Sequence, residues 1–119
     1  MRTLIALLAI CLSATIYAAD VDQLAAVDAI QTQDALLIDV RTDEEFTAGT
    51  LQGAQHVEYQ QIADKISQLQ PDKTAPIVLF CKSGRRSGIA QDELIKLGYS
   101  NVINAGGYEE LQSVLEASD

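Results

Sequence analysis

Two near-continuous apolar runs, at residues 35–40 and 76–80, predict strands that are buried on both faces of a sheet. Elsewhere apolar residues recur at helical spacing, which predicts helices over residues 21–31, 62–69, 84–97 and 108–115. Shorter extended segments are expected at residues 54–57 and 101–104, with a turn at residues 105–107. Strands that alternate with helices predict an α/β domain in which helices flank a central parallel sheet.

Two of the expected helices carry clear end signals. Thr42 followed by Glu45 three residues later forms a capping box, which predicts a short helix over residues 43–48 that stops at Gly49. Gly98 supplies a left-handed stop for the helix that starts near Gly84. That helix is expected to bury one face, made of Ile89, Ala90, Leu94 and Leu97.

Residues 1–19 form a separate segment that is apolar for most of its length. A short positive start with Arg2 precedes the apolar run, and small residues precede the acidic Asp20. This layout is typical of a secretory signal peptide cleaved near Ala18 or Ala19, so we expect an exported domain over residues 20–119, periplasmic in a bacterium. A retained anchor is the alternative, although the run is shorter than the about 20 residues of a spanning helix.

Length and charge narrow the class of protein further. The chain has 119 residues, 48% of them apolar, which is enough for one domain with a modest, mainly aliphatic core. The net charge of −9 becomes about −10 without residues 1–19, because Arg2 is their only charged residue. Such an acidic domain repels nucleic acid and anionic membranes, so we expect neither as a partner after signal cleavage.

Cysteine usage points to one position. Cys11 lies in the predicted signal segment, which leaves Cys81 as the single thiol of the mature domain. A lone thiol is unusual in an oxidising compartment, where cysteines generally pair in disulfides. Cys81 directly follows a predicted buried strand, at the carboxyl edge of the sheet, where α/β proteins place their sites.

The loop that Cys81 opens favours a thiolate. Residues 81–87 read CKSGRRS, so three cations, Lys82, Arg85 and Arg86, lie within five residues of the sulfur. Unpaired backbone N–H groups at the helix start attract an anion, and Gly84 lets the loop curl closely around it. A free cysteine is only about 3% ionised at pH 7, and lowering its pKa by about two units makes the thiolate the majority form. An inert, buried strand-end cysteine is the simpler alternative.

Four stretches of the chain together resemble the rhodanese family of single-domain sulfurtransferases, in particular its small periplasmic members. They lie in family order and at family spacing over about residues 36–111. The stretches are residues 37–41 with Glu45 and Phe46, residues 53–57, the loop 81–87, and residues 98–107.

The resemblance implies a three-layer domain with about five parallel strands and a double-displacement reaction. Cys81 would take sulfur from thiosulfate or a related donor and pass the persulfide sulfur to cyanide, a thiol or a protein thiol. Arg85 or Arg86 would hold the donor oxyanion, with Arg86 slightly favoured by its place in the motif. No cofactor or metal is implied. The implied donor-binding residues are Lys82, Ser83, Gly84, Arg85, Arg86 and Ser87.

Four residues outside the loop remain open to more than one interpretation. Asp39 and Arg41 fall at a strand end, where they could support the site or form a structural ion pair that involves Glu45. Thr50 stands where family members often carry a histidine, which we interpret as a packing change. His56 is the only histidine and cannot build a metal site alone, so we expect a structural role.

Two other functions compete with sulfur transfer. Cysteine phosphatases and arsenate reductases also use a cysteine–arginine loop, but they place five residues between the two. Here Arg86 follows Cys81 after four residues and Arg85 after three, which indicates a tighter loop. A binding module that keeps the fold without turnover is the second alternative, although such domains commonly lose the cysteine.

Overall fold

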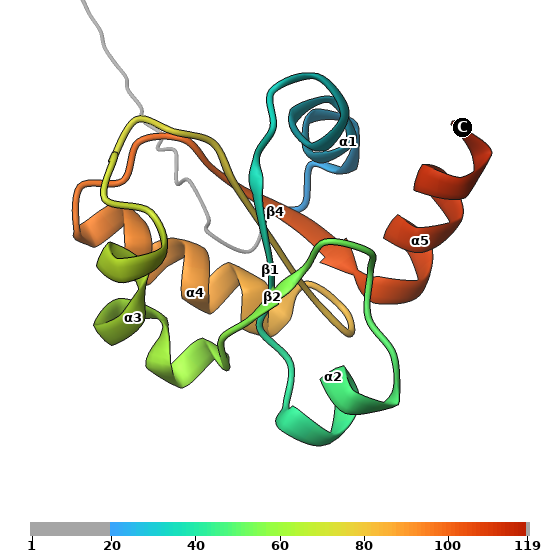
Figure 1. Cartoon of the computed structure of the whole chain (residues 1–119), viewed down its shortest axis with the longest axis horizontal. Helices are drawn as coiled ribbons and strands as arrows, with labels where there is room; N and C mark the ends of the chain where they lie inside the picture. Colours follow the sequence, from blue (N-terminus) through green and yellow to red (C-terminus); the bar gives the residue numbers. More distant parts are fainter. Residues whose placement is uncertain (1–19, 119) are drawn as a thin grey trace, which may run out of the picture.

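The computed structural model describes residues 20–118, so the predicted signal peptide and its cleavage site lie outside the described residues. Within them, four parallel strands form one sheet in the order β2-β1-β3-β4 (Figure 1). The strands are β1 (Leu36–Asp39), β2 (Gln55–His56), β3 (Ile77–Cys81) and β4 (Val102–Gly107). β1 and β3 are central, as their near-continuous apolar sequences predict.

Helices cover both faces of the sheet. On one side lie α3 (Ile62–Leu69), preceded by the 3-10 turn η1 (Tyr59–Gln61), and α4 (Arg85–Lys96). On the other side lie α1 (Gln23–Thr32) and α5 (Tyr108–Ala117), and the short α2 (Asp43–Ala48) follows β1 (Figure 1). No helix among residues 20–118 is long and apolar enough to cross a membrane.

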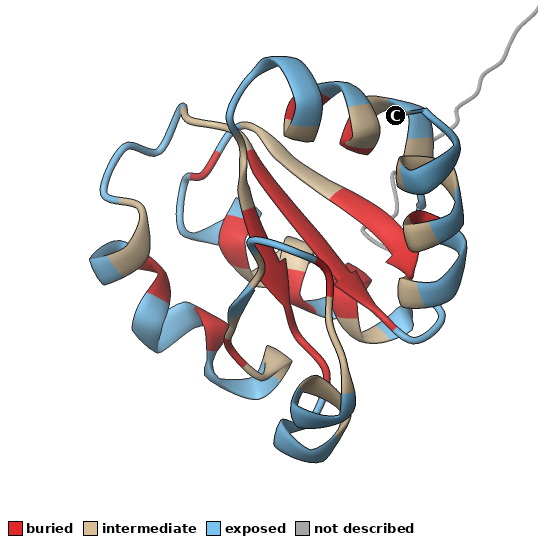
Figure 2. Cartoon of the chain, turned by 45° about the vertical axis from the view of Figure 1, so that its right-hand side comes forward, coloured by how far each residue is buried: buried red, intermediate tan, exposed pale blue. Residues whose placement is uncertain are grey.

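The two faces of the central strands belong to two separate hydrophobic clusters. Ile77, Leu79 and Cys81 of β3 pack toward α3 and α4, whereas Val78 and Phe80 pack toward α1 and α5. This alternation follows from the two-residue period of a strand. Figure 2 shows the resulting continuous band of buried residues along β1 and β3. Phe80, which precedes Cys81 in this band, is wholly buried, so packing fixes the end of the strand that carries the cysteine.

The predicted α/β fold with a parallel sheet between helices is confirmed, with four strands among the described residues where about five were expected. The place of a fifth strand, outside β4, is taken by the segment before α1, which makes one backbone hydrogen bond there, from Asp22 N to Asn104 O at 2.9 Å. The segment cannot extend as a strand because Asp22 is already the N-cap of α1, its side chain accepting from Ala25 N.

Residues 105–107 are also not the predicted turn, because β4 continues through them. Gly107 lies opposite Cys81 after a register shift between Leu79 and Cys81. A Cβ on Gly107 would lie only 2.5 Å from the carbonyl oxygen of Lys82. The glycine therefore lets the end of β4 pack directly against the loop that follows β3.

The predicted helix ends are largely confirmed. The capping box forms as expected, with Thr42 Oγ1 accepting from Glu45 N and the Glu45 carboxylate accepting from Thr42 N. Gly98 follows α4 with a φ of +99°. The predicted buried face of α4 is only partly correct, since its spacing centres on residues 87, 90 and 94, which leaves Ile89 and Leu97 partly exposed.

Candidate active site

Cys81 ends β3 and lies wholly buried beneath the loop that leads into α4. The chain turns into the helix at Gly84, whose φ of +104° is in the left-handed region that favours glycine. A Cβ at this position would also lie 2.9 Å from the Val21 side chain. Gly84 therefore permits both the turn and the close approach of the segment before α1.

Hydrogen-bond donors converge on the sulfur. Gly84 N donates to Cys81 Sγ at 3.0 Å, and Ser87 Oγ lies 3.4 Å from the same atom. Burial raises the pKa of the thiol, but hydrogen bonds from the Ser87 hydroxyl and from the N–H groups of Ser87, Ser83 and Gly84 lower it by more, so the net pKa falls below its ordinary value. The loop thus favours the thiolate, mainly through hydrogen bonds rather than nearby cations.

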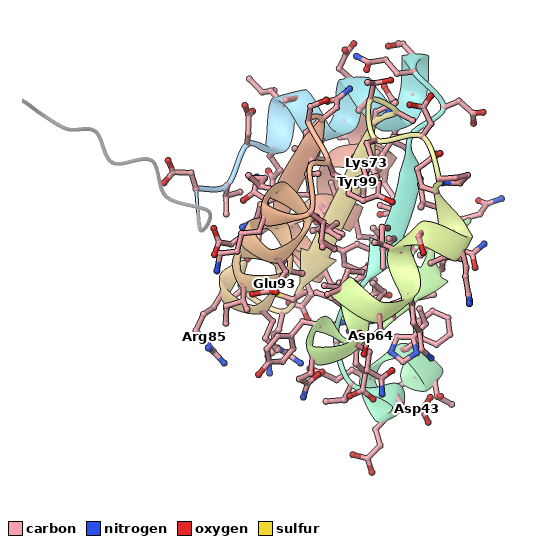
Figure 3. The ribbon with its side chains drawn as sticks, turned by 90° about the vertical axis from the view of Figure 1, so that its left-hand side faces the viewer. Asp43, Asp64, Lys73, Arg85, Glu93 and Tyr99 are labelled. Carbon is pink, nitrogen blue, oxygen red and sulfur yellow. The ribbon has the colours of Figure 1, made fainter. Side chains whose placement is uncertain are left out.

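Arg86 is committed to an ion pair across the sheet edge. Its Nη1 and Nη2 donate to Glu45 Oε1 at 2.8 Å and Oε2 at 3.2 Å. The hydrogen bond from Arg86 is the main cause that lowers the pKa of Glu45 to about 2, with further help from Thr42. Arg85 is exposed, and its side chain extends outward from the start of α4 (Figure 3). Neither arginine therefore points freely at the sulfur.

Asp39 and Arg41 form a buried ion pair at the end of β1. Arg41 Nη2 donates to Asp39 Oδ2 at 2.7 Å and to Gly49 O at 2.7 Å, while Nε donates to the same carboxylate. Thr50 Oγ1 donates to Asp39 as well, at 2.9 Å. Glu45 contributes to this pair only electrostatically, by helping to raise the pKa of Arg41, because the hydrogen bonds of its carboxylate go to Arg86 and Thr42. Through Gly49 and Thr50 the pair connects the end of β1 to the segment after α2, and Arg41 and Gly49 both line the cavity described below.

His56 has the structural contacts expected of it. Its ring stacks on Phe46 with centroids 4.5 Å apart, and Nε2 lies 2.9 Å from Arg41 O. Among residues 20–118, no group of three or more His, Cys, Asp or Glu side chains could hold a metal ion.

Asn104 belongs to the site and was not predicted from the sequence. It is wholly buried in β4, and its Oδ1 accepts from Ser87 Oγ at 2.7 Å. The one available signal was an amide side chain inside an otherwise apolar strand segment, and buried amides are retained where they have partners. Here those partners are parts of the loop around Cys81.

A cavity of about 470 Å³ opens beside the loop, between α2 and the start of α5. Among the loop residues only Lys82 lines it. The remaining walls come from Arg41, Glu45, Ala48, Gly49, Tyr108, Glu109 and Glu110. The cavity is large enough for a small anion or thiol, and Lys82 is the loop cation that such a molecule would meet.

Comparisons with known proteins agree on one family. A family model described as a rhodanese-like domain matches residues 22–113. The thiosulfate sulfurtransferase PspE of Escherichia coli (strain K12) is 35% identical over 74 residues, which are 62% of this chain and 71% of the relative. The thiosulfate sulfurtransferase GlpE of Pseudomonas fluorescens (strain SBW25) is 37% identical over 82 residues, covering 68% and 73%.

Solved structures give the same result. A structure described as a rhodanese with anions from E. coli has a TM-score of 0.62 at 34% identity, covering 64% of this chain and 89% of its own. The human single-domain sulfurtransferase TSTD1 has a TM-score of 0.63 at 28% identity, covering 72% and 88%.

Proposed function

The chain belongs to the rhodanese-like sulfurtransferase family, and on that basis we propose that it is a thiosulfate sulfurtransferase that carries sulfur as a persulfide on Cys81. The observation that carries the proposal is the set of hydrogen-bond donors from Ser83, Gly84 and Ser87 to Cys81 Sγ, at the carboxyl edge of the sheet. These donors lower the pKa of the Cys81 thiol. A thiolate in this position is a ready nucleophile.

In the first step the Cys81 thiolate attacks the outer sulfur of thiosulfate. A bond forms between Sγ and that sulfur, the sulfur–sulfur bond of thiosulfate breaks, and sulfite leaves with the electron pair. The negative charge of the thiolate passes to the outer sulfur of the new persulfide. Gly84 N donates to Sγ before the transfer, and the unpaired backbone N–H groups at the start of α4 would stabilise the charge on the outer sulfur.

In the second step a nucleophilic acceptor attacks the outer sulfur. With cyanide the products are thiocyanate and the regenerated Cys81 thiolate, and a thiol or protein thiol would leave as a persulfide. Covalent catalysis of this kind divides one difficult transfer into two easier ones. Thiosulfate and cyanide serve as the assay pair, and the proposal covers thiol acceptors as the wider class.

We assign donor binding to the loop residues Lys82, Ser83, Gly84, Arg85, Arg86 and Ser87, in four different roles. Gly84 and the serines provide hydrogen bonds close to the sulfur. Lys82, which lines the cavity, meets the sulfonate end of the donor. Arg86 acts mainly through its pair with Glu45, and Arg85 contributes long-range positive charge from the surface.

Residues 1–19 support a further proposal, that the protein is exported, which in a bacterium means to the periplasm. The test is expression of the full chain with a C-terminal tag, followed by fractionation and intact-mass measurement. Export predicts a periplasmic product shortened near Ala18 or Ala19. A product of full mass in the membrane fraction would support the retained anchor instead.

The experiment that tests the activity is intact-mass spectrometry after incubation of the reduced protein with thiosulfate. The expected result is the addition of one sulfur atom, its removal by cyanide, and no addition in Cys81→Ala. Failure of the reduced, folded protein to take up sulfur would reject the proposal. Phosphate esters and arsenate would then be the substrates to try.

A further inference from the structure

The side chain of Asn104 links β4 to two residues of the loop around Cys81, Gly84 and Ser87. Its Oδ1 accepts from Ser87 Oγ at 2.7 Å and from Gly106 N at 2.9 Å. Its Nδ2 donates to Gly84 O at 2.9 Å. The residue is wholly buried, so these bonds are protected from competition by solvent.

The Ser87 hydroxyl lies between two acceptors and carries one proton. Its Oγ is 2.7 Å from Asn104 Oδ1 and 3.4 Å from Cys81 Sγ. A hydroxyl donates one hydrogen bond at a time, and its proton can turn from one acceptor to another without movement of heavy atoms. Asn104 and Cys81 therefore compete for the same proton.

We infer that Asn104 is a positioning residue that directs the Ser87 proton according to where negative charge lies at Cys81. The inference rests on the proposed persulfide cycle. With a neutral Sγ, the shorter bond to Asn104 holds the proton, whereas a thiolate attracts it, because hydrogen bonds to charged atoms are stronger. In that state Oδ1 keeps the N–H of Gly106, so no buried acceptor is left unpaired.

Sulfur transfer reverses this arrangement. When the charge moves from Sγ to the outer sulfur of the persulfide, the Ser87 proton returns to Asn104. The competition also limits how strongly Ser87 stabilises the thiolate. A thiolate with a very low pKa is a weaker nucleophile. With Asn104 in place, the backbone N–H groups still keep Cys81 ionised, and the thiolate remains reactive toward the sulfur donor.

The test is a double-mutant cycle on the pKa of Cys81, measured by thiolate absorbance and by the pH dependence of alkylation with iodoacetamide. Ser87→Ala removes a donor and is expected to raise this pKa by about half to one unit. Asn104→Ala frees the donor and is expected to lower the pKa by a similar amount. In the Ser87→Ala background, Asn104→Ala should have no effect. A pKa raised by Asn104→Ala in both backgrounds would mean that Asn104 only holds the loop, which overturns the inference.

Gln91→Ala provides a matched control. Gln91 Nε2 donates to Val102 O at 3.0 Å. The substitution therefore also removes a hydrogen bond from a side-chain amide between α4 and β4, but one that lies away from Cys81. We expect no change in the Cys81 pKa. None of these variants alters the surrounding charges, so those cancel in the cycle. The charged groups are Arg85 and Arg86 of α4, Glu45 of α2, the Asp39–Arg41 pair at the end of β1, and Lys82 of the loop.

A second measurement needs no Asn104 variant and so does not depend on its folding. The side-chain carbonyl carbon of Asn104 reports hydrogen bonding to Oδ1 in carbon NMR. It is expected to titrate with Cys81 in the unsubstituted protein and to stay flat in Ser87→Ala. Equal titration in both proteins, or in neither, would overturn the inference. Sulfur uptake measured by mass on the same samples reports the proposed function separately.

Discussion

The ion pair between Glu45 and Arg86 allows a quantitative test of what holds the site together. The perturbations are Glu45→Gln, Arg86→Gln and the double variant. Glutamine at position 45 can still accept from the backbone N–H of Thr42, so the capping box survives, while the charge and one acceptor for Arg86 are removed. The cycle therefore isolates the coupling between α2 and α4.

The magnitude of the coupling energy between Glu45 and Arg86 follows from the pKa of Glu45. That pKa is about 2 in the folded domain, against about 4.3 in an unfolded chain. At 1.36 kcal/mol per unit the difference sets a ceiling of about 3 kcal/mol. Part of the shift comes from the bonds to Thr42, and partial exposure screens the pair, so we expect a coupling energy of about 1–2 kcal/mol.

The sign of the pH dependence is fixed by the direction of the shift. A lowered pKa stabilises the fold above about pH 4.3, and this contribution is lost as the pH falls toward 2, with roughly half gone near pH 3. Urea unfolding of the four proteins at pH 7 and pH 3 gives both coupling energies. A coupling below about 0.3 kcal/mol at pH 7, or one that does not shrink at pH 3, would refute the reasoning.

Three further predictions concern the surroundings of the loop. Asp39→Asn leaves a buried guanidinium without its countercharge and should lower the free energy of unfolding by about 3–5 kcal/mol; a loss below about 1 kcal/mol in urea titrations would contradict this. Gly107→Ala forces a Cβ against the loop carbonyl and should slow sulfur uptake at least about tenfold, whereas Gly53→Ala, which meets no atom within 4 Å, should not. Lys82→Gln should raise the KM for thiosulfate about threefold or more, which corresponds to about 0.7 kcal/mol. The charge-matched control Arg85→Gln should raise the KM less. Equal effects of the two variants in steady-state kinetics would mean that only net charge matters.

The sequence was informative wherever structure depends on neighbouring residues. The apolar runs at residues 35–40 and 76–80 predicted the two central strands, and the Thr42–Glu45 spacing predicted α2 with its cap, because both signals are local. Cys81 at a strand end with a glycine three residues later indicated the candidate site for the same reason.

Partners that are distant in sequence could not be predicted this way. Glu45 and Arg86 are 41 residues apart, and only the packing of α2 beside α4 shows that they meet. Gly107 was predicted to be in a turn because glycine is unfavourable in strands, yet here the strand needs it to approach Lys82. The role of Asn104 has no local sequence signal of its own, because it exists only once α4 and β4 are packed together.

The complete burial of the Cys81 sulfur bears on the regiochemistry of acceptor attack. A persulfide has two electrophilic sulfur atoms. Attack on the inner one would form a mixed disulfide between Cys81 and the acceptor and release the outer sulfur as hydrosulfide. In the proposed persulfide the outer atom extends about 2.05 Å beyond Sγ, while the inner atom stays shielded beneath the loop. An incoming thiolate then meets the transferable atom first, and the protein is kept from becoming trapped as a covalent adduct of its own acceptor.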